Sequence, residues 1–419
     1  MVSSVSVTSL LHDRRIALYW SGLLLSQIGS SMWRIALPWL AISLTGSSIG
    51  VATTLLVTLL PALIVGPAAG ALADRFPRQK AIIGLDLGRA ILFGIAFVIV
   101  QSLTGWSAVF ALSGIALIES LATTWYSSAR VGVMKALATE GHGLQALSAL
   151  DRTTNNIANL AGLVLGGVAI VSFGINRVLL INSISFVIAG VSALIAGLPS
   201  GQLGQRGQGE SRLAFAVAGL RHLHENWSAR QVVIAQAGLN LVIPLVVLGL
   251  PILASEEWRS AKWLGLASGA FAAGGLVASL LTGFRSLKAP TLLTIWGAVS
   301  VVAAMVFVTA VTNKFIALPA LFVAGFVSNA LGVVLLTNLQ SAVIGSLIGR
   351  VFALSSMANQ ATAAAVILTM SVLVSPQRFS HAMAIAAGVL VLFALVYGGI
   401  GGMARLTLSG PVMEVSSTE

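Results

Sequence analysis

Long apolar runs, interrupted only by short polar or charged clusters, cover almost the whole chain. Charge-free intervals extend over residues 35–73, 90–118, 153–176, 178–205 and 231–255, and similar intervals continue to residue 404. A helix needs ~20 apolar residues to cross the hydrocarbon core of a bilayer, and each of these intervals is longer than that. The runs are continuous, unlike the alternating ~10-residue segments of a membrane β-barrel. The pattern predicts an all-α polytopic membrane protein.

Cutting the apolar runs at charges and turn residues gives twelve spans. The polar turn Thr45-Gly46-Ser47-Ser48 divides the first long run into two spans. The predicted spans cover roughly residues 17–43, 48–72, 80–102, 106–129, 153–173, 177–198, 231–254, 262–284, 290–312, 315–343, 351–374 and 380–404.

One hydrophilic stretch, Pro199–Arg230, lies in the middle of the chain and divides the spans six and six. The expected domains are therefore an N-terminal bundle over 1–198, a cytoplasmic linker over 199–230 and a C-terminal bundle over 231–419. Apolar residues at helical spacing from Leu213 to Leu223 suggest an amphipathic helix on the membrane surface, or else an extension of the seventh span. A faint internal echo, Pro38 to Gly70 and Pro251 to Gly283, favours two related halves.

Composition supports a membrane environment, with 57% hydrophobic and 8% charged residues and a mean hydropathy of +0.98. Soluble chains carry about 25% charged residues. The net charge of +11 comes from short basic clusters between spans, which indicates topology signals and not a nucleic-acid partner. Of the 23 Lys and Arg, sixteen lie in the N-tail, the C-tail and the connections after even-numbered spans, and five lie in the opposite connections. This bias predicts a multi-pass protein of the bacterial cytoplasmic (inner) membrane with both termini in the cytoplasm.

Several chemistries lack the residues that they need. The chain has no cysteine, and none of its lysines precedes Ser or Thr, so neither thiolate chemistry nor a Walker A motif is present. The five histidines fall in tails, loops or span ends, away from any membrane-embedded haem or metal site. We therefore expect no cofactor, no metal and no enzymatic activity.

The strongest local motif is GALADRFPRQK over residues 70–80, between the second and third spans. It resembles the signature loop of the major facilitator superfamily, G-x-L-x-D-R-x-G-R-[RK], although Pro77 and Gln79 depart from that pattern. The resemblance implies two six-helix bundles that open alternately to either side of the membrane. It further implies a conformational latch, for which the candidates are Gly70, Asp74, Arg75, Arg78, Lys80 and Arg350. Alternatively, Asp74 only helps to set topology.

A second stretch, residues 158–167 in the fifth span, resembles the antiporter motif G-x-x-x-G-P-x-x-G-G of the same superfamily. Gly162, Gly166 and Gly167 match it, whereas Ala158 and Leu163 replace a Gly and the Pro. Small residues four apart also favour close helix packing without any further role. Shorter pieces, LPWL at 37–40, DLGR at 86–89 and GRV at 349–351, are similar to the branch with enterobactin and macrolide exporters. That branch handles siderophores, drugs and other amphipathic metabolites.

The leading hypothesis is a secondary exporter of a small amphipathic organic molecule, driven by proton antiport. A facilitative or proton-symport importer on the same fold is the alternative, and a lipid scramblase or membrane enzyme represents a different class. The expected partners are the small-molecule substrate, protons and the lipid bilayer, with the protein acting as a monomer.

Arg34 and Glu119 are the charges farthest from any span end. Arg34 precedes Leu44 by ten residues and Glu119 follows Trp106 by thirteen, which puts both ~15–20 Å below the outer surface at 1.5 Å per residue. Isolated charges at that depth are costly, so they usually pair or serve a pathway. We expect Glu119 to be the protonation site with Arg34 beside it, and Asp86, close to Arg89, to be the rival carrier. A purely structural ion pair stays open.

Polar side chains within the spans are the candidates for a substrate cavity with mainly apolar walls. They are Gln27, Ser31, Trp125, Asn155, Asn159, Gln236, Asn240, Asn329, Asn359 and Gln360. For any one of these Asn or Gln residues, a helix–helix hydrogen bond is the competing interpretation.

Overall fold

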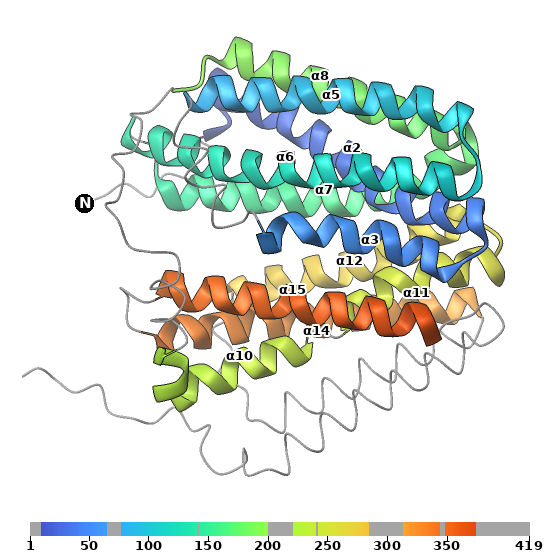
Figure 1. Ribbon diagram of the computed structural model, residues 1–419. Coiled ribbons are helices and arrows are strands. Elements are labelled where there is room, and N and C mark those ends of the chain that lie inside the picture. The colour runs from blue at the N-terminus through green and yellow to red at the C-terminus, as the bar shows by residue number, and fades with distance from the viewer. Residues whose placement is uncertain are drawn as a thin grey trace, which may run out of the picture.

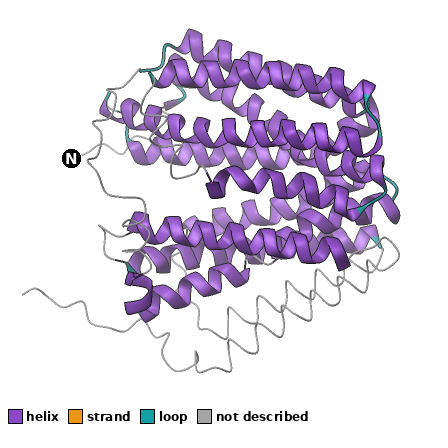
Figure 2. Ribbon diagram, viewed as in Figure 1, coloured by secondary structure: helices purple, strands orange, loops and turns teal. Residues whose placement is uncertain are grey.

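The computed structural model describes residues 10–64, 77–140, 142–199, 221–239, 242–284, 313–343 and 348–373. Long helices joined by short turns make up this part of the chain, and no strand occurs within these ranges (Figure 2). A helix satisfies all its backbone polar groups internally, which is what a spanning segment needs where no water is present.

Six helices belong to the first half of the chain and five described helices to the second. In the first half they are α2 (Arg14–Thr45), α3 (Ser48–Ile64), α5 (Arg78–Ser102), α6 (Gly105–Thr139), α7 (Leu144–Phe173) and α8 (Ile175–Ala196). In the second half they are α10 (Trp227–Leu239), α11 (Val242–Glu256), α12 (Ala261–Phe284), α14 (Lys314–Ala342) and α15 (Ile348–Leu373).

Local sequence explains where the first helices begin and end. The Asp13 carboxylate accepts a hydrogen bond from the Arg15 N–H and caps the start of α2. Gly46 ends the same helix in the left-handed region, at φ 60°, where a residue without Cβ is favoured. Gly174, at φ 79°, makes the short turn from α7 to α8.

The helices agree with ten of the twelve predicted spans, and α10 and α11 together occupy the seventh. Spans predicted at 290–312 and 380–404 lie outside the described residues, as do most of the linker and its predicted amphipathic helix. The fourth and fifth spans were predicted too short. Helix α6 continues past the predicted end of the fourth span to Thr139, and α7 begins before the predicted start of the fifth span, at Leu144. The error arose from cutting at charges, since Arg130 of α6 and Asp151 of α7 form an ion pair within these helices. By length and composition, six described helices could each cross a membrane.

The helices of each half pack against one another, and the two groups lie side by side, the first in the upper and the second in the lower part of Figure 1. We call the end with the turns at Gly46, Gly105, Gly174 and Arg259 the closed end. We call the opposite end, where α2 begins and α6 ends, the base. The predicted domain limits at 198 and 231 are consistent with this arrangement but remain a prediction, since 200–220 is not described.

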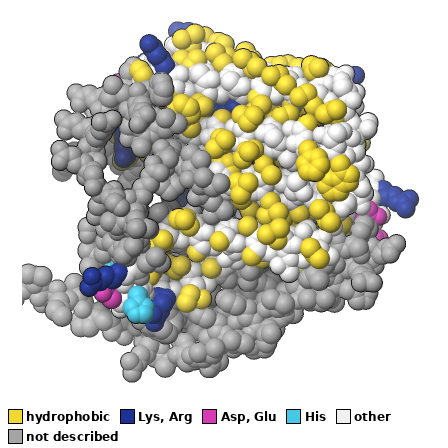
Figure 3. Space-filling view, viewed as in Figure 1, with side chains coloured by type: hydrophobic (Ala, Val, Ile, Leu, Met, Phe, Trp, Pro, Cys, Tyr) yellow, Lys and Arg dark blue, Asp and Glu magenta, His cyan; other side chains and the backbone are white. Residues whose placement is uncertain are grey.

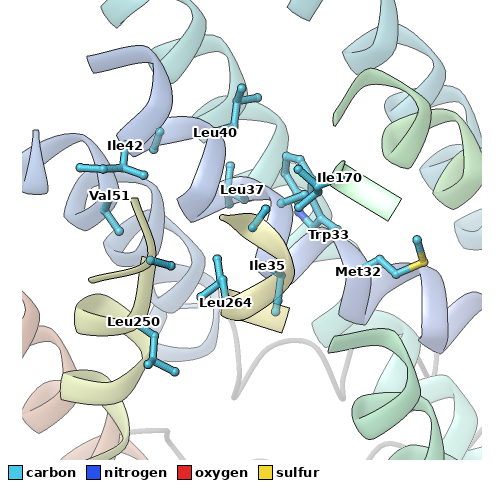
Figure 4. Close-up of a cluster of buried hydrophobic side chains, with 14 of the residues drawn as sticks. Met32, Trp33, Ile35, Leu37, Leu40, Ile42, Val51, Ile170, Leu250 and Leu264 are labelled. Carbon is cyan, nitrogen blue, oxygen red and sulfur yellow. The ribbon is translucent and has the colours of Figure 1, made fainter. Parts of the chain in front are cut away.

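Apolar side chains form three buried clusters that differ between the two ends. At the closed end, one cluster combines side chains from both halves, among them Trp33, Ile42 and Val51 with Leu250 and Leu264 (Figure 4). At the base, one cluster around Tyr19 and Leu147 belongs wholly to the first half. Another, around Leu335 and Val351, belongs wholly to the second half. Within the described ranges, the core that the halves share therefore lies at the closed end.

Large apolar side chains also cover the outside of the described helices. Ile195 is 68% exposed, Ile91 65% and Phe110 62%, values that water would penalise but lipid would not. Figure 3 shows many such side chains on the visible face of the first half. Together with the hydropathy, this surface identifies a multi-pass integral membrane protein.

Candidate functional site

The charge deepest in α2, Arg34, is held by polar neighbours on its own helix and on α7. One terminal nitrogen, Nη2, donates to the Ser31 hydroxyl at 2.6 Å and to the Asn159 side-chain oxygen at 2.8 Å. The guanidinium has five N–H donors, so three are left with no hydrogen bond from the described residues. The side chain is exposed although its helix packs on α3, α6, α7 and α8. Arg34 therefore presents free donors from the interior of the bundle.

Glu119 of α6 lies within electrostatic reach of Arg34, but the two do not form a salt bridge. Its carboxylate accepts a hydrogen bond from the Thr123 hydroxyl at 2.8 Å, one turn further along α6. The half-buried carboxylate keeps accepting capacity that this single bond does not use. The structure thus brings the two predicted charges into one region, but they do not form a direct ion pair.

Asp86 of α5, the rival carrier, lies in a different environment. It is fully buried and forms an ion pair with Arg89, also buried, three residues along the same helix. The Arg89 guanidinium lies 4.3 Å from the ring centres of both Tyr126 and Phe186, which is cation–π distance. Asp86 therefore differs from Arg34 in being buried and directly ion-paired.

The remaining candidates on the first-half helices show two kinds of environment. Ser31 and Asn159 contact Arg34, as described above, and Gln27 accepts the Ser31 hydroxyl on its backbone oxygen. The buried Nε2 of the Gln27 side chain has no hydrogen-bond partner among the described residues. Asn155 instead donates to Asp151, which places it with the Arg130–Asp151 ion pair. Trp125 is half-buried on α6.

Two of the second-half candidates bond to neighbouring helices. Gln236 of α10 accepts a hydrogen bond from the Ser355 hydroxyl of α15 at 2.7 Å. Asn329 of α14 accepts from the Ser279 hydroxyl of α12 at 2.9 Å. Both contacts match the competing interpretation of helix–helix hydrogen bonds. Asn359 and Gln360 are half-buried on α15, and Asn240 lies outside the described residues.

The predicted latch is described only in part. Gly70, Asp74 and Arg75 lie outside the described residues, as does the side chain of Arg350 on α15. Arg78 begins α5 and donates to the Gly132 carbonyl of α6 at 3.1 Å, within the first half. Lys80 is exposed on the first turn of α5.

Glycines of α7 bring three helices close together near the closed end. A Cβ added at Gly166 would lie 2.9 Å from the Met32 Cα of α2. One added at Gly167 would lie 2.6 Å from the Gly265 Cα of α12, in the other half of the chain. The small residues of the antiporter-like stretch thus serve close packing within the first half and between the halves.

Sequence reasoning missed the aromatic residues that surround Asp86. Tyr19 and Tyr126 are buried in the first half, next to the Arg130–Asp151 ion pair. Their signal in the sequence is weak, because two tyrosines inside apolar spans look like ordinary core residues. Rarity is the only hint, since the chain has three tyrosines in total.

The fold and sequence together define a membrane transporter. The family model described as Major Facilitator Superfamily matches residues 19–367, and the chain belongs to this family. Solved structures with the same fold include the nucleoside transporter NupG (TM-score 0.72, 12% identity, 92% of this chain and 98% of that one). A bacterial homologue of the iron transporter ferroportin, in an inward-facing state, is also similar (TM-score 0.69, 16% identity, 94% and 99%). This confirms the predicted family and fold class, and a transporter rather than an enzyme.

Curated relatives match shorter parts of the chain. An uncharacterized MFS-type transporter of Bacillus subtilis (strain 168), YfiS, is 34% identical over 132 residues, which cover 32% of this chain and 30% of YfiS. Macrolide efflux protein A of Streptococcus pyogenes is 26% identical over 193 residues, 45% of each chain. The chain thus matches less than half the length of either relative.

Proposed function

We propose that this protein exports a small amphipathic organic molecule by proton antiport, using alternating access between its two halves. The observation that carries the proposal is the pair of unneutralised charges, Arg34 and Glu119, deep within the first half. Charges retained at that depth are expensive and usually belong to a substrate or ion pathway. The similarity to a macrolide efflux protein supports the direction of transport.

The substrate site is proposed to lie between the halves, facing Arg34, Asn159 and Glu119 on one side. Polar residues of the second half, Asn359 and Gln360, face it from the other side, and the remaining walls are apolar. Such a site suits an amphipathic ligand, because a few polar groups orient it while apolar contacts supply affinity.

Coupling is proposed to use Glu119 as the carboxylate that takes up a proton. A proton moving across 100 mV supplies ~2.3 kcal/mol, enough for a roughly fifty-fold substrate gradient. Arg34 attracts the ionised carboxylate, so its position relative to Glu119 sets how readily the proton binds. With the base on the cytoplasmic side, as the basic residues predict, the shared core at the closed end corresponds to an inward-facing state.

Uphill transport of a radiolabelled macrolide into inverted membrane vesicles tests this proposal. The wild type should accumulate it when a proton gradient is imposed and lose it when a protonophore is added. Glu119→Gln should abolish accumulation, and Arg34→Ala should move the pH optimum upward, because Glu119 would hold its proton at higher pH. Thr123→Val removes only the hydroxyl that bonds Glu119 and should retain accumulation in weakened form. A Glu119→Gln protein that still accumulates substrate would refute the coupling role.

Direction is decided by the same vesicles. A proton-symport importer would accumulate substrate in right-side-out vesicles and not in inverted ones, and a facilitative importer would accumulate it in neither, so uphill transport into inverted vesicles separates the exporter from both.

A further inference from the structure

A second carboxylate, Asp86, lies inside the first half and away from the proposed substrate site. One oxygen, Oδ1, receives the Arg89 guanidinium, while the buried Oδ2 has no hydrogen-bond partner among the described residues. A buried carboxylate oxygen without a partner is costly, so native proteins usually supply one or use the group. The unbonded oxygen therefore points to a ligand that the protein chain itself does not provide.

Polar side chains continue from Asp86 toward the base. Tyr126 and Tyr19 present their hydroxyls to each other, and neither hydroxyl has a hydrogen bond of normal geometry within the described residues. Both tyrosines are nearly inaccessible, at 5% and 2% exposure. The next groups are Arg130 and Asp151, whose ion pair spans 3.4 Å and whose side chains are 15% and 13% exposed. The Arg130–Asp151 pair is thus more accessible than Asp86 and the two tyrosines.

Three buried polar atoms of this series have no hydrogen-bond partner among the described residues. They are the Asp86 Oδ2, the Tyr126 hydroxyl and the Tyr19 hydroxyl. Buried polar atoms without protein partners typically bind ordered water, which makes about three hydrogen bonds to such groups. Carboxylates, hydroxyls and water each accept and donate protons, so together they can pass a proton along a line.

We propose that Asp86 is a second protonation site of the transporter, reached by protons from the base through Asp151, Tyr19, Tyr126 and intervening water. We call these four residues the buried polar chain. Arg89 stabilises the ionised carboxylate, and protonation frees Arg89 to interact with the Tyr126 and Phe186 rings alone. This route uses neither Arg34 nor Glu119.

The described titratable side chains within electrostatic reach of Asp86 are Arg89 of α5, Tyr126 of α6 and Tyr19 of α2. Arg130 of α6 and Asp151 of α7 act on Tyr19 in turn. Helix α8 contributes Phe186 and Gly190, where a Cβ would lie 3.5 Å from the Asp86 Cβ, and neither residue titrates. Arg89 on α5 is the cation in direct contact.

Infrared titration of the purified protein in lipid nanodiscs tests whether Asp86 binds a proton. A protonated carboxylic acid has a carbonyl stretch that is distinct from the backbone amide bands. All protonated carboxyl groups contribute such a band as pH falls, so the Asp86 component is identified as the one present in the wild type and missing in Asp86→Asn, and Asp86→Glu should restore it at a shifted frequency. Glu119→Gln should retain it, which separates this site from the one in the proposed function. If the titratable band survives unchanged in Asp86→Asn, the assignment is overturned.

The rate of protonation after a rapid pH drop tests the route. Tyr19→Phe combined with Tyr126→Phe keeps both rings but removes the hydroxyls, and should slow the rise of the Asp86 band roughly tenfold, equal to ~1.4 kcal/mol of barrier. Ser127→Ala is the matched control, because its exposed hydroxyl bonds only to the Thr124 carbonyl of its own helix. This test also works if Asp86→Asn fails to fold. An unchanged rate in the double variant would overturn the route.

Although the inference extends the proposed proton coupling, the two can fail separately. The infrared measurements need no substrate, so a transporter with another coupling ion could still show the Asp86 band. Conversely, transport that depends on Glu119 with no Asp86 band would support the proposed function alone.

Discussion

At the closed end, a single apolar cluster includes side chains from α2, α3, α7, α11 and α12, whereas at the base each half has a cluster of its own. Backbones also approach closely at the closed end, at Gly167 and Gly265. The Ser48 hydroxyl adds a hydrogen bond to the Ser371 carbonyl across the halves, at 3.1 Å. The difference teaches where motion costs most: opening the closed end must separate a packed core, while each base cluster moves with its own half.

Two charged groups border the shared apolar core. Arg34 lies between the core members Trp33 and Ile35 but has an exposed side chain, and Glu119 lies on the base side of Ala116, another core member. Under the proposed function, a proton or substrate that enters from the base reaches Arg34 and Glu119 while the closed end stays packed. Two rigid halves with one shared core are the kind of bistable element that alternating access needs.

The largest expected effect comes from filling the space between the halves at Gly167. Gly167→Leu would place side-chain atoms where the Gly265 Cα and the Ala261 carbonyl already lie, within 2.6 Å of the new Cβ. Overpacking of this kind costs ~1–3 kcal/mol, which shifts the equilibrium roughly 5- to 160-fold toward the state in which the halves separate at this end. Transport should fall accordingly, because one of the two states is disfavoured.

Cysteine labelling measures that shift without background, because the chain has no cysteine. Leu264→Cys places a reporter in the shared core, where the native side chain is 2% exposed. Maleimide labelling should become faster when Gly167→Leu is added. Gly114→Leu is the control, since a Cβ there meets nothing within 4 Å. Equal labelling in all three proteins would mean that the Gly167 contact does not hold the halves together.

A smaller effect is expected from the hydrogen bond that crosses the halves. Ser48→Ala removes the Ser48 hydroxyl and leaves the buried Ser371 carbonyl without this bond. Net contributions of such bonds are ~0.5–1.5 kcal/mol, so labelling at Leu264→Cys should accelerate roughly two- to ten-fold. Ser43→Ala is the matched control, because its hydroxyl bonds to the Trp39 carbonyl within α2 alone. A slower rate in Ser48→Ala would contradict the assigned role.

The sequence was enough to predict helix positions and the depth of charged residues, but not their contacts. Helix positions were predictable because lipid demands long apolar runs, and the runs show where the helices lie. The charges at 34 and 119 could be placed at a common depth from residue counts alone. The structure added that Arg34 bonds to Asn159 and not to Glu119, since rotamers and helix rotation decide such contacts.

Contacts between helices far apart in the sequence were out of reach. Gly167 and Gly265 are close-packing residues, but nothing in either local sequence names the other as its partner. Tyr19 and Tyr126 belong to different spans, and only the tertiary fold brings their hydroxyls together. The ends of α6 and α7 were missed because charges were taken as span ends, although helices continue past the membrane surface with their charges paired.

The smallest effect should come from a charge pair on the exposed surface near the base. Arg221 Nε donates to the Glu225 carboxylate at 2.9 Å, and this hydrogen bond lowers the pKa of Glu225 below its ordinary value. A depressed carboxylate pKa stabilises the local helix above the ordinary pKa, and that contribution disappears as pH falls through the lowered value. Both side chains are well exposed, so solvent and salt screen the pair. Glu225→Gln should therefore leave labelling at Leu264→Cys unchanged at neutral pH, while a carbon-13 titration of wild-type Glu225 reports the lowered pKa. A change in labelling would mean that the base also holds the halves together, and the contrast between the two ends would then be weaker than the apolar clusters indicate.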